Sequence, residues 1–214
     1  MPSPTHNRPP VKPAALLVLE GDTEEVFYTI LRDEFLGGIR IDLRNIKGRG
    51  NINKDLLAEI YKFTYNNRND LVRAYCCLDT ESQNQSATPF DLEVVRENVK
   101  ASKDMRQVLS VDAILANPEI ESLFFYDIEG IYKFLNAKKS QRNIRKYTNP
   151  QKLSKKDLQQ LFRKFGKVYA PGRRTEHFMR SLDINSIVAS CQDLSTGLRL
   201  IKAQADNTAS HLSL

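Results

Sequence analysis

The sequence lacks any long hydrophobic run. The chain has 214 residues, and its hydrophobic content of 41% is enough for a packed core. No run approaches the ~20 consecutive apolar residues that cross a bilayer. Residues 1–13 are proline-rich and basic, without the apolar segment of a secretory signal. We therefore expect a flexible leader at 1–13, no membrane span and a cytoplasmic location.

Cysteine is scarce, and nucleotide-binding loops are missing. The chain has three cysteines, of which Cys76 and Cys77 are adjacent within an expected buried strand. This spacing matches neither a disulfide framework nor a zinc-binding pattern, which agrees with a reducing compartment. The sequence also lacks the Gly-x-Gly-x-x-Gly and Walker patterns. The sequence therefore contains no ATPase motif of its own.

Acidic residues are scarce in the last third of the chain. The formal net charge is +6, but residues 1–136 hold 16 basic and 21 acidic residues, whereas residues 137–202 hold 16 basic and only 4 acidic residues. A basic segment of this kind can neutralise phosphates. The alternative is a solvated basic helical face.

Strands and helices are expected to alternate along the first part of the chain. This order is typical of an α/β fold with a mostly parallel sheet covered by helices on both faces. Near-continuous apolar residues predict a central third strand, and alternating residues predict a half-buried second strand at an edge. The expected strands lie at 14–19, 39–46, 71–78 and 108–115, and the expected helices at 23–36, 52–66, 89–101 and 119–135.

The remainder of the chain is expected to be helical, with helices at 154–165 and 175–203. We therefore divide the sequence into the leader at 1–13, an α/β domain at 14–136, a basic helical extension at 137–204 and a disordered tail at 205–214.

Acidic residues follow two of the expected strands. Glu20 comes directly after the first strand, and Asp79 and Glu81 follow the third. The carboxyl ends of parallel strands meet at one edge of a sheet, where open α/β folds place their ligands. Carboxylate oxygens suit hard cations such as Mg²⁺ and Mn²⁺, which neutralise a phosphodiester and activate water. We therefore predict Glu20, Asp79 and Glu81 as catalytic metal-binding residues.

Two further acids can reach the same edge. Glu24 lies one helical turn after Glu20, and Glu121 comes from the loop-to-helix segment after the fourth strand. We include both as candidate metal ligands. We interpret Asp22, Glu25 and Glu119 as solvated acids that complement helix dipoles. For any single acid of the set, strand-end capping or simple exposure is the alternative.

This arrangement resembles the Toprim domain. Glu20-Gly21 matches the Toprim Glu after the first strand, and Asp79-Thr80-Glu81 matches the Asp-x-Asp motif, with Glu in place of the last Asp. The pattern Glu20-Gly21-x-x-Glu24-Glu25 is similar to the small OLD-like and RloB-like Toprim proteins of bacterial defence and mobile-element loci. The segment 117–121, Asn-Pro-Glu-Ile-Glu, resembles the Asn-Pro-x-aromatic-Glu segment of the RloB-like group, with Ile120 at the aromatic position. The resemblance covers residues 14–136.

The resemblance implies a nuclease dependent on Mg²⁺ or Mn²⁺ that hydrolyses DNA or RNA. It also implies a role as an antiphage effector working with a partner ATPase or sensor protein. The alternative is a non-catalytic or latent Toprim subunit that docks on a partner protein. Strand-passage and primase activities need further domains, and this chain is too short for them.

Basic residues provide candidate nucleic-acid contacts. Arg49 lies within a Gly-Arg-Gly turn after the second strand and Lys47 precedes it, so both can supply charge to a phosphate backbone, although a simple tight turn explains that segment equally well. His177 is a candidate proton shuttle, with an exposed or capping histidine as the alternative. The candidates in the basic extension are Lys155, Lys156, Arg163, Lys164, Lys167, Arg173 and Arg174.

Overall fold

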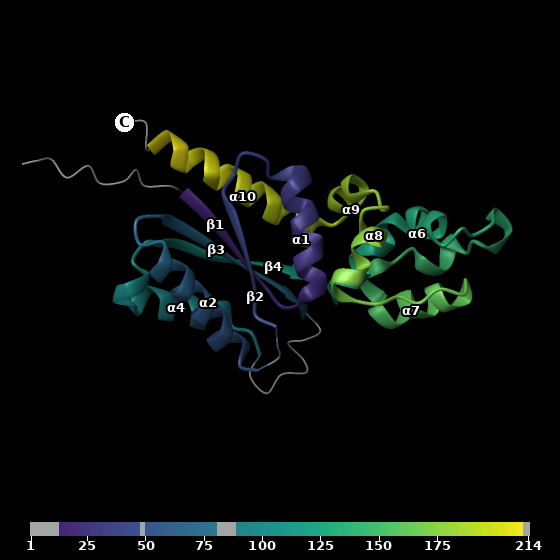
Figure 1. Cartoon of the computed structure of the whole chain (residues 1–214), viewed down its shortest axis with the longest axis horizontal. Helices are drawn as coiled ribbons and strands as arrows, with labels where there is room; N and C mark the ends of the chain where they lie inside the picture. Colours follow the sequence, from purple (N-terminus) through teal and green to yellow (C-terminus); the bar gives the residue numbers. More distant parts are fainter. Residues whose placement is uncertain (1–12, 48–49, 81–88, 212–214) are drawn as a thin grey trace, which may run out of the picture.

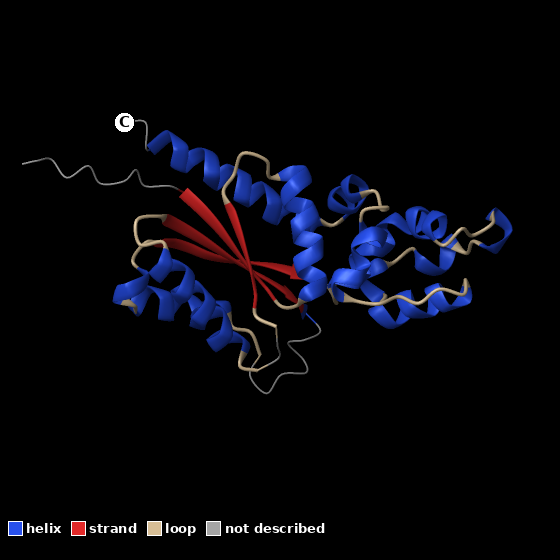
Figure 2. Ribbon diagram, in the orientation of Figure 1, coloured by secondary structure: helices blue, strands red, loops and turns tan. Residues whose placement is uncertain are grey.

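The computed structural model describes residues 13–47, 50–80 and 89–211, with side chains up to residue 203. These residues form a four-stranded, fully parallel sheet flanked by helices (Figures 1 and 2). The α/β class and the strand–helix alternation expected from the sequence are therefore confirmed. The sheet order is β2-β1-β3-β4, built from β1 (Pro13–Leu19), β2 (Ile41–Asn45), β3 (Leu71–Asp79) and β4 (Val108–Ala116).

The position of each strand follows from its apolar pattern. The near-continuous apolar strands β1 and β3 lie in the centre, whereas β2, with alternating polar residues, lies half-buried at an edge. Leu19 pairs in register with both Asn45 and Cys77, and Asp79 pairs with Ala116. The carboxyl ends of all four strands therefore lie at one edge of the sheet.

Helices cover both faces of the sheet. Alternate residues of each strand face two separate hydrophobic clusters, with Leu16 and Val18 in one and Leu17 and Leu19 in the other. Two helices pack on each side, as Figure 1 shows. They are α2 (Ile52–Asn66) and α4 (Leu92–Ala101) on one face, and α1 (Asp22–Phe35) and α10 (Gln192–His211) on the other.

Short helices between β4 and α10 form a lobe at the carboxyl edge of the sheet (Figure 1). We call residues 120–190 the helical lobe. Its helices are α5 (Ile120–Leu123), α6 (Ile128–Phe134), α7 (Lys155–Lys164), α8 (Glu176–Met179) and α9 (Ile184–Ser190). The chain also contains 3-10 turns at Lys103–Met105, Phe124–Asp127, Lys139–Gln141, Ile144–Tyr147, Pro150–Lys152 and Gly172–Thr175.

The lobe and the sheet share one hydrophobic core. The ring of Phe27 on α1 lies 5.8 Å from that of Phe124, which lies 5.7 Å from Phe178 on α8. Buried residues of α7, α9 and α10 belong to the same cluster as one face of the sheet. The stretch expected as a basic extension therefore contributes directly to the core of the α/β fold, and α10 continues as helix to His211, into the expected tail.

Three helices differ from the sequence expectation. The helix expected at 89–101 begins only at Leu92, because the Asp91 side chain accepts hydrogen bonds from the backbone N–H groups of Glu93 and Val94. The expected helix at 119–135 is divided into two, with the Asp127 carboxylate capping the second at Gly130. The third, expected at 175–203, is interrupted where Asp183 caps α9. In the second and third cases a side-chain cap starts a new helix within an apolar pattern that sequence periodicity treats as continuous.

Within the described residues, no helix is both long enough and apolar enough to cross a bilayer.

The contact between α10 and β4 depends on a glycine. A Cβ placed on Gly197 would lie 2.6 Å from Cδ1 of Ile114, a buried and conformationally stiff side chain. Although Gly→Ala favours an exposed helix by about 1 kcal/mol, overpacking costs about 1–3 kcal/mol. We expect Gly197→Ala to lower the melting temperature, and to lower it less in an Ile114→Val background. Thermal unfolding measures both melting temperatures. An equal decrease in melting temperature in the two backgrounds would contradict this account.

Candidate metal centre

The first acidic segment lies where β1 turns into α1. Glu20 follows the last residue of β1, and Gly21 precedes α1 in an extended conformation. A Cβ on Gly21 would lie only 3.0 Å from Oε2 of Glu24. The Glu-Gly pair therefore leaves room for the Glu24 carboxylate, which is buried to 7% exposure despite its position in the first helical turn.

Asp79 connects three segments at the carboxyl edge of the sheet. It is the last residue of β3, and its backbone N–H donates to Oε2 of Glu20 over 3.3 Å. Its Oδ1 accepts a 2.9 Å hydrogen bond from the backbone N–H of Ile120, at the start of α5. The neighbouring Thr80 hydroxyl lies within hydrogen-bond distance of the Asn117–Pro118 segment. These contacts hold the ends of β1, β3 and β4 together.

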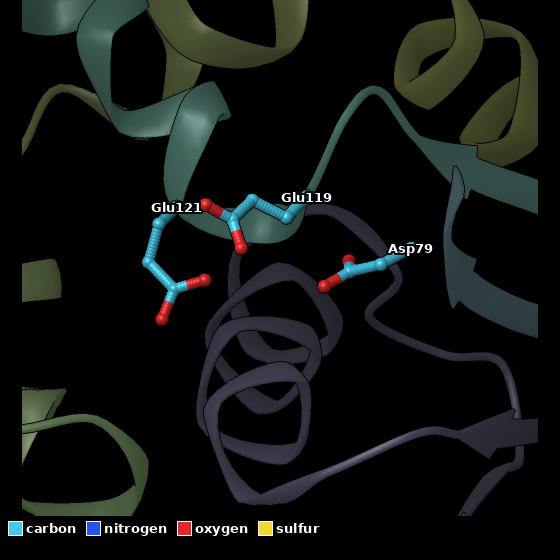
Figure 3. A group of neighbouring side chains, drawn as sticks. All are labelled: Asp79, Glu119 and Glu121. Atoms are coloured by element: carbon cyan, nitrogen blue, oxygen red, sulfur yellow. The ribbon is translucent and has the colours of Figure 1, made fainter. Parts of the chain in front are cut away.

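Three carboxylates converge at this point. Asp79, Glu119 and Glu121 each offer an oxygen, and these oxygens all lie within 4.8 Å of one another. Figure 3 shows the three side chains arranged around a common space, with two of them carried by the segment that opens α5. Glu121 is only 2% exposed. A cluster of oxygen donors at this spacing has the chemistry of a hard divalent cation site.

The three carboxylates are among the residues that line a larger acidic pocket, with a volume of about 420 Å³. The pocket lies between the sheet edge and the helical lobe, and Pro171 and Gly172 of the lobe form part of its wall. The Gly172 backbone N–H donates to the Thr23 hydroxyl, which closes this wall onto the start of α1. The charged residues that line the pocket are Glu20, Asp22, Glu24, Asp79, Glu119 and Glu121, together with Lys47 and Lys155.

Burial, together with the neighbouring acids, raises the pKa of two carboxyl groups in the pocket. Burial, reinforced by the charges of Glu24, Glu20 and Glu121, raises the pKa of Asp79 to about 9. Burial likewise raises the pKa of Glu24 to about 7, with contributions from Glu121 and Glu20. Protons therefore stabilise this pocket when no other cation is bound, because burial and the charges of neighbouring acids disfavour the ionised carboxylates.

The helical lobe supplies donors to the acids. The Lys155 ammonium lies 3.6 Å from Oε1 of Glu121, and the Lys155 backbone N–H donates to the Glu119 carboxylate. The Tyr169 hydroxyl donates to the same Glu121 oxygen over 3.1 Å. Burial and the Glu121 charge raise the pKa of Tyr169, which keeps this hydroxyl a donor.

The structure places most of the predicted acids together. Glu20, Glu24, Asp79 and Glu121 line one pocket, as their spacing along the strands indicated. Glu81 lies outside the described residues. Glu119, interpreted from the sequence as a solvated helix-start acid, belongs to the closest group of three carboxylates. It precedes α5 in an extended conformation, and this backbone geometry is not visible in the sequence pattern.

The basic residues predicted to contact nucleic acid differ in their surroundings: some line the pocket, some bond to the backbone of the chain, and others are exposed. Lys47 and Lys155 line the acidic pocket, while Arg49 lies outside the described residues. The ammonium of Lys167 donates to the backbone oxygen of Phe134, and that of Lys164 donates to the Gln141 backbone. The side chains of Lys156, Arg163, Arg173 and Arg174 are exposed.

His177 is exposed, and its ring packs against Phe134, 5.7 Å between centroids. It is not among the described residues that line the acidic pocket.

No protein-family model, curated protein or solved structure matches the chain. The interpretation of the pocket therefore depends on its own residues and their chemistry.

The raised pKa of Asp79 predicts a pH-dependent stability of the metal-free protein. An unfolded Asp has a pKa of about 3.9, whereas the folded value is about 9. Between these values the folded state binds more protons, so the free energy of unfolding decreases as the pH rises. Asp79→Asn keeps the acceptor for Ile120 but removes the charge.

In the presence of a chelator, we expect Asp79→Asn to melt above wild type at pH 8, by about 2–4 °C for each kcal/mol gained. The difference should shrink at pH 5, because little of the interval between the unfolded and the folded pKa of Asp79 lies below this pH. Glu97→Gln, at an exposed acid on α4, is the matched control and should change little. A variant less stable than wild type at pH 8 would contradict the assignment of a strained, buried carboxylate.

Proposed function

We propose that the protein is a divalent-metal-dependent nuclease that hydrolyses phosphodiester bonds of DNA or RNA at the acidic pocket. The observation that carries this proposal is the convergence of Asp79, Glu119 and Glu121 within 4.8 Å at the carboxyl edge of a parallel sheet. Ligands of open α/β folds bind at this edge. The sequence resemblance to Toprim nucleases supports the same chemistry, and so does the order of the acids along the chain.

The residues of the pocket fit Mg²⁺ or Mn²⁺. All candidate ligands are carboxylates, which hard cations prefer. The raised pKa values of Asp79 and Glu24 fit as well, because a cation would replace the protons that these acids retain. Asp79, Glu119 and Glu121 would hold the cation, with Glu20 and Glu24 completing the site. Such a cation, when bound, neutralises phosphate charge and activates water.

The protein itself orients these groups. The Ile120 backbone N–H fixes one oxygen of Asp79, and the Asp79 N–H positions Glu20. Glu20 is half-buried at the pocket wall, and we assign it the uptake of the proton from the attacking water. Lys47, at the pocket, and the exposed Lys156, Arg163, Arg173 and Arg174 would contact substrate phosphates.

The biological setting follows from the resemblance alone and is part of the proposal: an antiphage effector working with a partner ATPase. A latent subunit that depends on such a partner is the second candidate. The ion pair between Lys155 and Glu121 favours it, because a cation of the chain already engages one of the proposed metal ligands.

Removing Asp79 should abolish cleavage while leaving the fold intact. We expect Asp79→Ala to lower Mg²⁺- or Mn²⁺-dependent cleavage by at least about 10²-fold, in line with losses of metal-site residues. Relief of charge repulsion should maintain or raise its stability. The assay follows nicking of plasmid DNA and degradation of RNA, with Glu97→Ala as the exposed-acid control. Wild-type cleavage by Asp79→Ala at saturating metal would exclude the acid from catalysis.

Binding of nucleic acid should be strongly salt-dependent. Each phosphate contact contributes roughly 0.9 to the log–log slope of affinity against salt on duplex DNA, or about 0.7 on single strands. We expect reversal of charge at Arg173 and Arg174 to weaken binding to all sequences alike, because phosphate contacts carry no base information.

The measurement compares duplex DNA, single-stranded DNA and RNA between low and physiological salt, using Asp79→Ala to prevent cleavage. Charge reversal at Arg68, an exposed arginine in the turn between α2 and β3, is the control. No binding to any nucleic acid at low salt by the folded protein would leave docking on a partner protein as the role of the basic residues.

A further inference from the structure

Lys155 is the residue through which the basic lobe contacts the acidic pocket. It opens α7, and Ser154 and Asp157 fix this helix start with a reciprocal capping box. The Lys155 backbone N–H donates to Glu119, and its ammonium lies 3.6 Å from Glu121. Both partners belong to the closest group of three carboxylates. Lys155 therefore engages two of the three proposed metal ligands at once.

The side chain of Lys155 meets an unusual environment. Its own exposure is 38%, whereas the Glu121 side chain is only 3% exposed, so the ammonium reaches inward to a buried carboxylate. Of the residues that the structure describes, six acids and two lysines line the pocket. Among the ion pairs of the described residues, that of Lys155 is the one that joins a pocket acid to a pocket lysine. The oxygen it contacts, Oε1, also accepts from Tyr169.

The Lys155 ammonium would repel any second cation that binds Glu121. Like charges a few Å apart repel strongly where water is partly excluded. A divalent cation that binds Glu121 would therefore have to share this carboxylate with the ammonium or displace it. The flexible lysine stem permits displacement, while the backbone N–H of the same residue can keep its bond to Glu119.

We propose that Lys155 is a built-in counter-ion of the acidic pocket, and that its competition for Glu121 sets the affinity of the pocket for divalent metal. In the metal-free protein the ammonium compensates the buried charge of Glu121 and docks the helical lobe on the sheet edge. A divalent cation bound in the pocket would take Glu121 from the Lys155 ammonium. This inference rests on the proposed metal-dependent function and adds the control of metal affinity by the lobe.

The test is a calorimetric titration of the intact protein with Mn²⁺ at pH 8, without nucleic acid. Lys155→Met keeps the length of the side chain but removes its charge, and we expect Mn²⁺ to bind roughly tenfold more tightly, since one repelling charge is lost. Lys155→Arg retains the charge and should bind as wild type does. Lys156→Met, at the exposed neighbouring lysine, is the matched control and should also bind as wild type does.

Thermal unfolding establishes that each variant is folded; Lys155→Gln replaces Lys155→Met if the latter does not fold. If the neutral variant binds Mn²⁺ no more tightly than wild type does, the proposal about Lys155 is overturned, while the metal site itself stands. An equal gain in Lys156→Met would overturn it too, because the effect would then reflect general surface charge. Absence of Mn²⁺ binding in wild type and in every variant would overturn both this inference and the proposed metal-dependent function.

Discussion

The mutual repulsion of carboxylates at one edge of the sheet is the constraint on which the rest of the structure depends. Parallel strands bring Glu20 and Asp79 to the same edge, and the turn after β4 adds Glu119 and Glu121. Gathering ionised acids in a partly buried pocket is unfavourable. The raised pKa values of Asp79 and Glu24 express this cost directly. A fold that retains such an arrangement needs compensation from protons, donors or cations.

The protein supplies part of this compensation from the helical lobe. Backbone N–H groups at the starts of α5 and α7 donate to Asp79 and Glu119, and Tyr169 and Lys155 engage Glu121. The lobe is anchored independently by aromatic packing between Phe124 and Phe178 and by α10, which returns to the sheet. The pocket is therefore formed by the sheet edge and the lobe together. A divalent cation would supply the remaining compensation, which links the electrostatics of the pocket to its proposed chemistry.

The sequence predicted the frame of this site well because its signals are local. Periods of two and 3.6 residues mark strands and helices, and continuous apolar runs mark central strands. Glu20 and Asp79 were identified because they directly follow such runs. Helix boundaries were less predictable, because Asp127 and Asp183 each start a new helix inside an apolar pattern. A capping side chain competes with continuation of the preceding helix, and only a few hydrogen bonds decide the outcome. The spacing of apolar residues contains no information about this competition.

By itself, the sequence determined the alternation of strands and helices, the central place of β1 and β3, and the presence of acids at the strand ends. Only the tertiary structure decided that Glu119 faces the pocket and that α10 completes one face of the sheet. It alone also decided that Lys155 reaches Glu121. The physical reason is sequence separation. Burial patterns and strand ends depend on residues that are neighbours in the sequence, so they can be predicted from it. The direction of the Glu119 side chain and the contact of Lys155 with Glu121 result from packing between segments far apart in the chain.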